Sequence, residues 1–347
     1  MKYKFLKYFL IFTIPFLTYL SFTGTGIITY SPIIEAFVLI PFLEFFLKPN
    51  DKNLSEAEEE MIKDDKMYDY ILYLSIPIVY LLLYIFLSSM QDQTLSFYDR
   101  LGRILSMGLI CGSFGINIGH ELGHRNNIFE QSLSKILLLS SLYMHFFIEH
   151  NRGHHKNVST RDDPSSARYG EMIFIFWLRS IITGYISAWK LELKRLKRFN
   201  KNILSINNEM LLFQLIQISF LLIIIYFFGF QITGYYLITA LLGVLVLETV
   251  NYIEHYGLER KININGKYER IMPYHSWNSN HPMGRIMLFE LSRHSDHHFN
   301  SLRKYQILKN HENSPEMPTG YPGMMILSLF PPLWFYVMHK KIRSFIT

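Results

Sequence analysis

Cysteine is almost absent from this sequence, which has only Cys111 among its 347 residues. A single cysteine cannot form a disulfide within the chain, and it cannot supply the thiolates of a cysteine-rich zinc site or an iron–sulfur cluster. If the chemistry of this protein requires electrons, they must therefore come from another molecule.

Charged residues are also scarce, since Asp, Glu, Lys and Arg together make up 18% of the chain. Hydrophobic residues make up 50% and aromatic residues 16%, and the mean hydropathy is +0.13. Few soluble domains have this composition. The net charge of +6 comes from basic residues beside apolar runs, without a basic platform interleaved with aromatic residues. It therefore indicates membrane topology and excludes nucleic acid as a partner.

Long apolar runs, by contrast, are frequent, and each approaches the roughly 20 residues that cross a bilayer. We identify about six, at residues 9–22, 26–47, 70–87, 101–118, 210–228 and 231–254. The first run resembles a signal peptide, but residues 21–26 show no clear cleavage pattern and the second run follows at once. The sequence therefore predicts a helical hairpin at the start of an all-α integral membrane protein.

The basic residues predict how this protein is oriented, because short loops rich in Lys and Arg stay in the cytoplasm. The amino terminus and the segment "KLELKRLKRFNK" at 190–201 are basic, whereas "TGTG" and "GFQITG" carry no charge. If successive spans cross the membrane in opposite directions, both termini and every histidine cluster lie on the cytoplasmic side. We expect one membrane-embedded domain, 1–347, with a histidine-rich cytoplasmic cap at about 120–205 and 255–347.

Histidine is concentrated in a few short stretches: "NIGHELGHR", "EHNRGHH", "NYIEHYGLER" and "LSRHSDHH". On a helix, His120 and His124 lie one turn apart, His150 and His154 share a face with His155 about a hundred degrees round, and the three histidines from 294 to 298 share a face. One isolated histidine is more often a hydrogen-bonded core residue than a ligand. Eight in three clusters, with His255 at a membrane boundary, indicate a site for two metal ions.

The type of ligand does not select the metal, because imidazole suits zinc, copper, iron and nickel. The first stretch also resembles H-E-x-x-H, the zinc-protease pattern. Candidates for a second layer, which would orient the ligands, are Glu121, Glu149, Glu254 and Asp296. His281 and His275 flank "SWNSN" and either orient ligands or order that loop; His145 is a second-layer or packing residue, and we expect His311 and His339 at the surface.

Several motifs together resemble the membrane alkane 1-monooxygenases, within the histidine-box fatty acid desaturase and hydroxylase superfamily. These are "HELGHR", "FFIEHNRGHHKN" followed by "DDPSSAR", "NYIEHYGLER", "HSWNSNH", "LSRHSDHH" and "PTGYPGM", in the same order and with similar spacing. The likeness runs from about the second span to Met338. The forms "HNRGHH" and "NYIEHYGL" are also similar to those of the xylene methyl-group hydroxylase. Arg125 stands where the family usually has Lys, which affects no expected ligand.

This resemblance implies a non-haem centre of two iron ions, held by His120, His124, His150, His154, His155, His255, His294, His297 and His298. It implies that one oxygen atom of O2 enters the terminal C–H bond of medium- or long-chain alkanes, giving 1-alkanols. It also implies electrons from rubredoxin and its reductase, with NADH or NADPH as their source, and a place in the bacterial cytoplasmic (inner) membrane. A saturated carbon offers no polarised bond to attack, so O2 must be activated by a redox-active metal, which zinc is not.

Three alternatives stay open at this point. The same histidine cap could desaturate or hydroxylate fatty-acyl chains, or hydroxylate xylene-type methyl groups. A non-enzymatic metal carrier would require polar residues along the spans, which are almost purely apolar. The basic residues of 190–201, namely Lys190, Lys194, Arg195, Lys197 and Arg198, are either a docking site for an acidic rubredoxin or a topology signal alone. Aromatic residues such as Phe42, Phe45 and Phe46 either line a substrate channel or pack helices.

Overall fold

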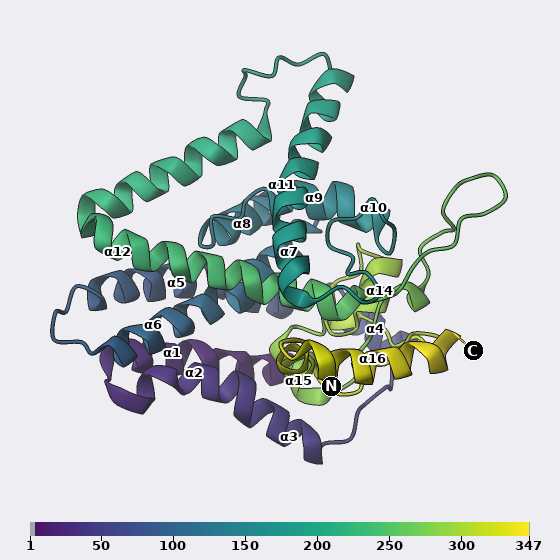
Figure 1. The fold of residues 1–347 in the computed structure, drawn as a ribbon, viewed down its shortest axis with the longest axis horizontal. Coiled ribbons are helices and arrows are strands. Elements are labelled where there is room, and N and C mark those ends of the chain that lie inside the picture. Colours follow the sequence, from purple (N-terminus) through teal and green to yellow (C-terminus); the bar gives the residue numbers. More distant parts are fainter. Residues whose placement is uncertain (1–3, 347) are drawn as a thin grey trace.

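The computed structural model describes residues 4–346, and these form helices joined by loops (Figure 1). Within that range, extended pairing is limited to two isolated bridges, Ile262 with Tyr268 and Asn278 with Glu316. Five helices are long and apolar enough to cross a membrane: Lys4–Thr23, Gly26–Phe46, Lys66–Ser89, Phe97–Gly123 and Glu209–His255. The predicted fold class, an all-α membrane protein with clustered histidines, is confirmed.

The predicted amino-terminal hairpin is present as two helices that pack against each other. They consist of η1 (Lys4–Phe12) with α1 (Thr13–Thr23), and of η2 (Gly26–Tyr30), α2 (Ser31–Ile34), η3 (Glu35–Leu39) and α3 (Ile40–Phe46). The chain then leaves the helix before Pro49, which disfavours helical backbone in the preceding residue. Phe42, Phe45 and Phe46 are exposed on α3, so these three aromatic residues face outward and do not line a channel.

The next two spans begin at side-chain caps. Asp65 accepts a hydrogen bond from the Met67 amide at the start of α5 (Lys66–Ser89), and Ser96 forms a capping box with Asp99 at the start of α6 (Phe97–Ile110). Helix α6 continues through η4 (Cys111–Ile116) into α7 (Asn117–Gly123). The resulting continuous span, Phe97–Gly123, places His120 near its carboxyl end.

Helix α12 (Glu209–His255) contains the last two predicted apolar runs. Its 47 residues correspond to about 70 Å of helix, more than twice the roughly 30 Å hydrocarbon core of a bilayer. Gly229 interrupts it with φ 79° and ψ 171°, a conformation available mainly to glycine. Figure 1 shows the green helix turning back sharply, so its two arms correspond to the predicted runs 210–228 and 231–254.

Outside these spans, α4 (Glu56–Ile62) precedes the third span. The other elements lie within the residue ranges of the predicted cap: α8 (Ile128–Leu139), α9 (Phe146–Glu149), η5 (His150–His154), α10 (His155–Asn157), α11 (Ile173–Arg198), η6 (Pro273–His275), α13 (Pro282–Met287), α14 (His294–Phe299), η7 (Tyr305–Ile307), α15 (Tyr321–Ser328) and α16 (Pro331–Ile346). Helix α11 is an element that the sequence analysis did not recognise. It runs across α12 (Figure 1) and exposes apolar residues, including Phe174, Leu178 and Ile182.

Candidate metal centre

The nine clustered histidines come from four parts of the chain, and the structure gathers them into two groups, each of which could hold a metal ion. His120, His124, His150, His155 and His297 form the five-histidine group; His154, His255, His294 and His298 form the four-histidine group. Within each group the ligand atoms lie within 4.8 Å of one another. Two spanning helices end at these groups: α7, at the end of its span, carries His120, and α12 ends at His255.

The turn that carries "HNRGH" determines which group each of its histidines joins. It is the π-helical turn η5 (His150–His154), which is wider than an α-helical turn because its hydrogen bonds span five residues. His150 and His155, five apart, therefore join the five-histidine group, whereas His154 joins the other. The expectation that His150 and His154 share a face is wrong, because it assumed α-helical spacing.

The short helix α14 also serves both groups. His294 and His298, one α-helical turn apart, belong to the four-histidine group, and His297 belongs to the five-histidine group. The expected single face for all three is therefore wrong, because α14 lies between the two groups and presents a different side to each.

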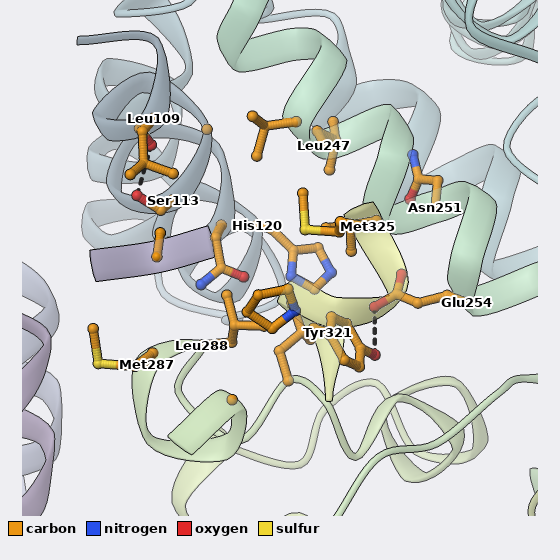
Figure 2. Close-up of a pocket in the computed structure, with 18 of the residues that line it drawn as sticks. Leu109, Ser113, His120, Leu247, Asn251, Glu254, Met287, Leu288, Tyr321 and Met325 are labelled. Carbon is orange, nitrogen blue, oxygen red and sulfur yellow. Dashed lines mark hydrogen bonds between the residues drawn. The ribbon is translucent and has the colours of Figure 1, made fainter. Parts of the chain in front are cut away.

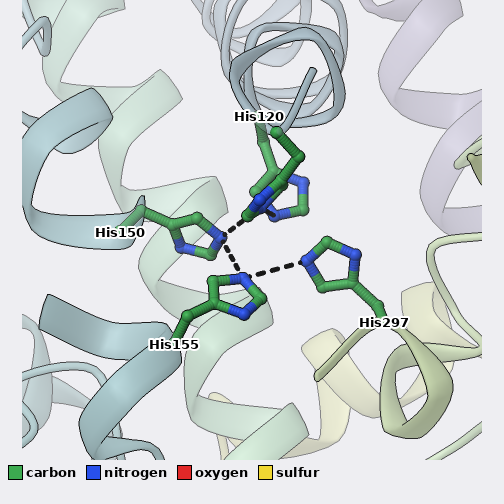
Figure 3. Close-up of side chains that lie close together, drawn as sticks. His120, His150, His155 and His297 are labelled. Atoms are coloured by element: carbon green, nitrogen blue, oxygen red, sulfur yellow. Dashed lines mark hydrogen bonds between the residues drawn. The ribbon is translucent and has the colours of Figure 1, made fainter. Parts of the chain in front are cut away.

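In the five-histidine group the Nε2 atoms converge. The Nε2–Nε2 distances are 3.2 Å from His120 to His124, 3.0 Å from His124 to His150, 2.9 Å from His150 to His155, and 3.1 Å from His155 to His297. Figure 3 shows the rings of His120, His150, His155 and His297 pointing toward a common centre. Nitrogen ligands about 2.1 Å from one ion and at right angles to each other would lie about 3.0 Å apart.

The four-histidine group repeats this geometry. Its Nε2–Nε2 distances are 3.2 Å from His154 to His298, 2.9 Å from His298 to His294, and 3.2 Å from His294 to His255. All four residues are buried. Both groups therefore offer nitrogen atoms at spacings that suit ligands of a shared cation.

Hydrogen bonding among the rings cannot account for this convergence. Each Nε2 atom carries either one proton or one lone pair, so it can take part in only one good hydrogen bond. His124 Nε2 nevertheless lies 3.2 Å from His120 Nε2 and 3.0 Å from His150 Nε2, and His298 Nε2 likewise has two such neighbours. A cation would satisfy all of these lone pairs at once, so the residues fit a metal in each group.

Burial keeps the rings in the form that binds metal. It lowers the pKa of His297 to about 3. Burial, reinforced by the neighbouring histidines, also lowers the pKa values of other rings well below their ordinary value, namely His124, His150, His155, His294 and His298. Neutral imidazole, which these shifts favour at neutral pH, is the ligating form.

Asp163 orients one of these rings. Its Oδ2 atom accepts a hydrogen bond from His154 Nδ1 at 2.9 Å and another from Ser166 Oγ at 2.5 Å. Burial acts to raise the pKa of Asp163, but the nearby His154 and these hydrogen bonds lower it. An ionised acceptor at Nδ1 directs the Nε2 lone pair toward the metal position. The sequence analysis did not identify Asp163, although it lies in "DDPSSAR", directly after the second cluster.

Glu254 is the predicted acid that lies closest to a histidine ligand atom. Its Oε2 atom is 3.2 Å from His294 Nε2, and its Oε1 atom accepts a hydrogen bond from the Tyr321 hydroxyl at 2.8 Å. The Glu254 carbonyl accepts from the Trp277 amide at 2.8 Å, so "HSWNSNH" braces this end of α12. Tyr321, in "PTGYPGM", is a further site residue that the sequence analysis did not single out.

Two other predicted acids are paired with basic groups. Glu121 Oε1 accepts from Arg125 Nη2 at 2.7 Å, which gives the unusual arginine a buried partner. Asp296 accepts from His311 Nε2 at 2.7 Å and from Arg303 Nη1 at 2.8 Å. His311 and His339 are both partly exposed, in agreement with the expected surface positions, and both are hydrogen-bonded; His339 Nε2 lies 2.8 Å from the Tyr256 hydroxyl.

The last two predicted second-layer residues occupy different surroundings. Glu149 is buried beneath the π-helical turn, where burial and then the charges of Asp163 and Glu248 raise its pKa. A Cβ atom at Gly153 would lie 2.6 Å from Glu149 Oε1, which explains the glycine in "HNRGHH". His281 Nδ1 hydrogen-bonds Ser279 Oγ at 3.1 Å, so it takes part in ordering its own loop.

An apolar cavity ends at both histidine groups, and Figure 2 shows part of its lining, with His120 and Glu254 among the apolar side chains. Its walls include Ile14, Phe37, Leu109, Val250 and Met325 from the spanning helices and α15. At one end it is lined by His120 and His150 of the five-histidine group and by His294 and Glu254 beside the four-histidine group. An aliphatic molecule in this cavity would touch both candidate metal positions.

A membrane-spanning helical bundle with nine histidines at the end of an apolar cavity defines a histidine-box membrane enzyme. The sequence model of the family described as "Fatty acid desaturase" matches residues 100–328. The chain is 39% identical to Alkane 1-monooxygenase 1 of Alcanivorax borkumensis, covering 88% of this chain and 76% of that protein. It is 40% identical to Alkane 1-monooxygenase 2 of Pseudomonas aeruginosa, covering 89% of this chain and 82% of that protein.

A more distant relative is the Xylene/toluene monooxygenase hydroxylase component of Pseudomonas putida, 24% identical over 70% of this chain and 64% of that protein. The chain therefore belongs to the alkane 1-monooxygenase family, within the broader fatty acid desaturase family. It is an oxidoreductase of the monooxygenase type.

Proposed function

We propose that this protein hydroxylates the terminal carbon of linear medium- or long-chain alkanes to 1-alkanols, using O2 and a centre of two iron ions. The observation that carries the proposal is the apolar cavity that ends at His120, His150 and His294. A linear alkane dissolves in the bilayer, and an apolar cavity between spans suits such a substrate. The names of the relatives, alkane 1-monooxygenases, point to the same substrate class.

The nine histidines are the residues that would hold the two irons, one in each group. Imidazole is a suitable ligand for iron, and the neutral rings require no proton release before binding. The bound irons would supply the redox chemistry that activates O2, which zinc cannot provide.

The chain itself contributes binding, orientation and exclusion of water. The walls of Phe37, Leu109 and Val250 hold an alkyl chain without offering hydrogen bonds, so the terminal carbon is selected by position in the cavity. Glu254 can hold a proton at Oε2, beside His294, while the Tyr321 hydroxyl keeps the carboxylate oriented. Acid–base chemistry cannot attack a saturated carbon, so the chain contributes by holding the terminal carbon in position.

For the electrons we propose rubredoxin, or a similar small acidic carrier, reduced through its reductase by NADH or NADPH. We place the protein in the cytoplasmic (inner) membrane with the histidines and both termini on the cytoplasmic side. The basic end of α11 offers the carrier Lys190, Lys194 and Lys197, whereas Arg195 is already paired with Glu192 at 2.7 Å. Reversing the charge of the three lysines should slow turnover at low salt; unchanged turnover would remove this docking site.

The main experiment is product analysis by mass spectrometry. Membranes with the protein, rubredoxin, its reductase, NADH and labelled O2 are given a panel of linear alkanes, xylenes and fatty-acyl substrates. Labelled 1-alkanol, made in an iron-dependent reaction, is the expected product. Unlabelled alkene, or product from fatty-acyl substrates alone, would contradict the proposed function.

A second candidate is hydroxylation of methyl groups on aromatic rings. The observation that favours it is the likeness to the Xylene/toluene monooxygenase hydroxylase component. The same substrate panel separates the two, because labelled benzylic alcohol without 1-alkanol would select this candidate.

A further inference from the structure

A second groove lies beside the apolar cavity, along a neighbouring face of the second arm of α12. It lies between α11, both arms of α12 and the loop before α9. The groove and the cavity are close together. His145 lines the groove, whereas the next residue, Phe146, lines the cavity; Val244 lines the groove, whereas Leu247, one helical turn further along α12, lines the cavity. None of the nine histidines belongs to the groove.

The rim of the groove is apolar and open. Ile182 and Ile186 of α11 and Leu237 and Leu241 of α12 line it and are exposed. Since α12 is apolar enough to span a membrane, its exposed leucines face lipid chains. An aliphatic molecule could therefore enter the groove from the bilayer without crossing water.

The inner part of the groove is polar and incompletely bonded. His145, only 6% exposed, packs edge-on against Tyr143 and Tyr185, and its Nε2 atom has no hydrogen-bond partner among the described residues. Gln214 Nε2 is likewise buried without a partner in that part of the chain, whereas Gln217 Oε1 is used by the Met144 amide at 3.1 Å. An unpaired buried nitrogen is costly, so a ligand oxygen that reached these atoms would be favoured.

The charges of the groove restrict the head group of such a ligand. The residues that line it include no Lys, Arg, Asp or Glu among those the structure describes. Burial lowers the pKa of His145 to about 4, so its ring is neutral at neutral pH. A neutral hydroxyl, which can both donate and accept, suits a neutral imidazole and an amide better than a carboxylate or a phosphate, which would require a cationic partner.

We infer that this groove binds a single-chain aliphatic alcohol, with its hydroxyl between His145 and Gln214 and its chain between α11 and α12. This binding does not depend on turnover. Only the identification of the alcohol as the product of this same protein rests on the proposed function, and a binding experiment without electrons or O2 tests the groove separately.

The experiment uses the full chain in lipid nanodiscs and a long-chain 1-alkanol with a diazirine far from its hydroxyl. Photolabelled residues are mapped by peptide mass spectrometry. Comparison probes carry the same diazirine on an alkane, a fatty acid and a phospholipid. We expect the alcohol to label Ile182, Leu237 and Leu241, and the double variant His145→Phe, Gln214→Leu to reduce this labelling about tenfold, the effect of two lost neutral hydrogen bonds.

The matched control is Gln231→Leu, the same substitution at an exposed glutamine of α12, which should leave labelling unchanged. Leu241→Trp fills the groove from its exposed rim and should also block labelling, so the test does not depend on the buried variant folding. Metal content of each variant reports whether the histidine groups are intact. Equal labelling by the alkane, labelling only by the fatty acid or phospholipid, or alcohol labelling unaffected by both the double variant and Leu241→Trp would overturn the inference.

Discussion

His154 Nδ1 and Asp163 Oδ2 lie 2.9 Å apart, and both side chains are fully buried. This contact links the second histidine cluster to the loop that follows it, and it leaves His154 Nε2 facing the other three rings of the four-histidine group. The Nδ1 atom of His154 is thus bonded to the protein, and its Nε2 atom is available to bind a metal.

Replacing Asp163 should therefore weaken metal binding at the four-histidine group. Partners that orient a ligating histidine typically contribute about 10- to 100-fold in metal affinity, so we expect a loss of that size for Asp163→Ala. Asp163→Asn keeps an acceptor and should lose less. The measurement is iron bound per chain in competition with a chelator; Asp162→Ala, at the exposed neighbouring position, is the control and should bind iron normally.

The two histidine groups should lose metal independently. His297→Ala removes a ligand from the five-histidine group and His298→Ala from the four-histidine group, although the two residues are adjacent. His298→Ala leaves three histidines in its group and should retain about half of the bound iron, because the other group is complete, whereas His297→Ala leaves four and should weaken binding at its group less. Metal analysis with Mössbauer spectroscopy should show a different iron signal affected in each variant. Loss of the same signal in both would mean that the nine histidines do not form two separate sites.

The depth of the apolar cavity should set the longest substrate. Ala36 is buried and lines the cavity, whereas Val38, two residues away, is exposed. Ala36→Phe shortens the cavity and should lower turnover of the longest alkanes about tenfold relative to shorter ones. Val38→Phe should leave the chain-length profile unchanged. Competition between alkanes of different length, followed by gas chromatography of the alcohols, measures this ratio.

Glu290 should stabilise the contact between the first span and the cap. It is buried and accepts hydrogen bonds from Lys7 Nζ at 2.6 Å and from Arg285 Nε at 2.5 Å. Burial acts to raise the pKa of Glu290, but the charges of Lys7 and Arg285 and their hydrogen bonds lower it to about 2. Glu290→Gln should therefore reduce the free energy of unfolding by about 3 kcal/mol at neutral pH.

The pH dependence of this effect follows from the direction of the shift. An unfolded Glu has a pKa of about 4.3, so a folded value near 2 stabilises the protein fully above pH ~4.3 and progressively less as the pH falls toward about 2. The difference in thermal stability between wild type and Glu290→Gln should narrow across that window. A difference independent of pH would refute the assigned charge. Glu312→Gln, at an exposed position, is the control.

Much of the architecture could be read from local pattern. The apolar runs predicted the spans because a bilayer requires long uncharged helices whatever their neighbours are. The histidine clusters singled out eight of the nine residues that converge in the structure, and the position of His255 at a membrane boundary singled out the ninth. The amphipathic helix α11 (Ile173–Arg198) was not recognised, since its apolar residues are divided between a buried face and an exposed face. The partner of His154 was missed for another reason: Asp163 shares no helical register with it.

The sequence by itself determined that this protein is a membrane-spanning helical bundle with a concentration of imidazoles at the span ends, because hydropathy and residue identity are properties of short segments. Only the tertiary structure decided how those imidazoles are divided. The π-helical turn η5 sends His150 and His154 to different groups, and α14 does the same for His297 and His298. Which group each histidine joins depends on backbone geometry and on which helices pack together, and neither can be derived from the spacing of the residues.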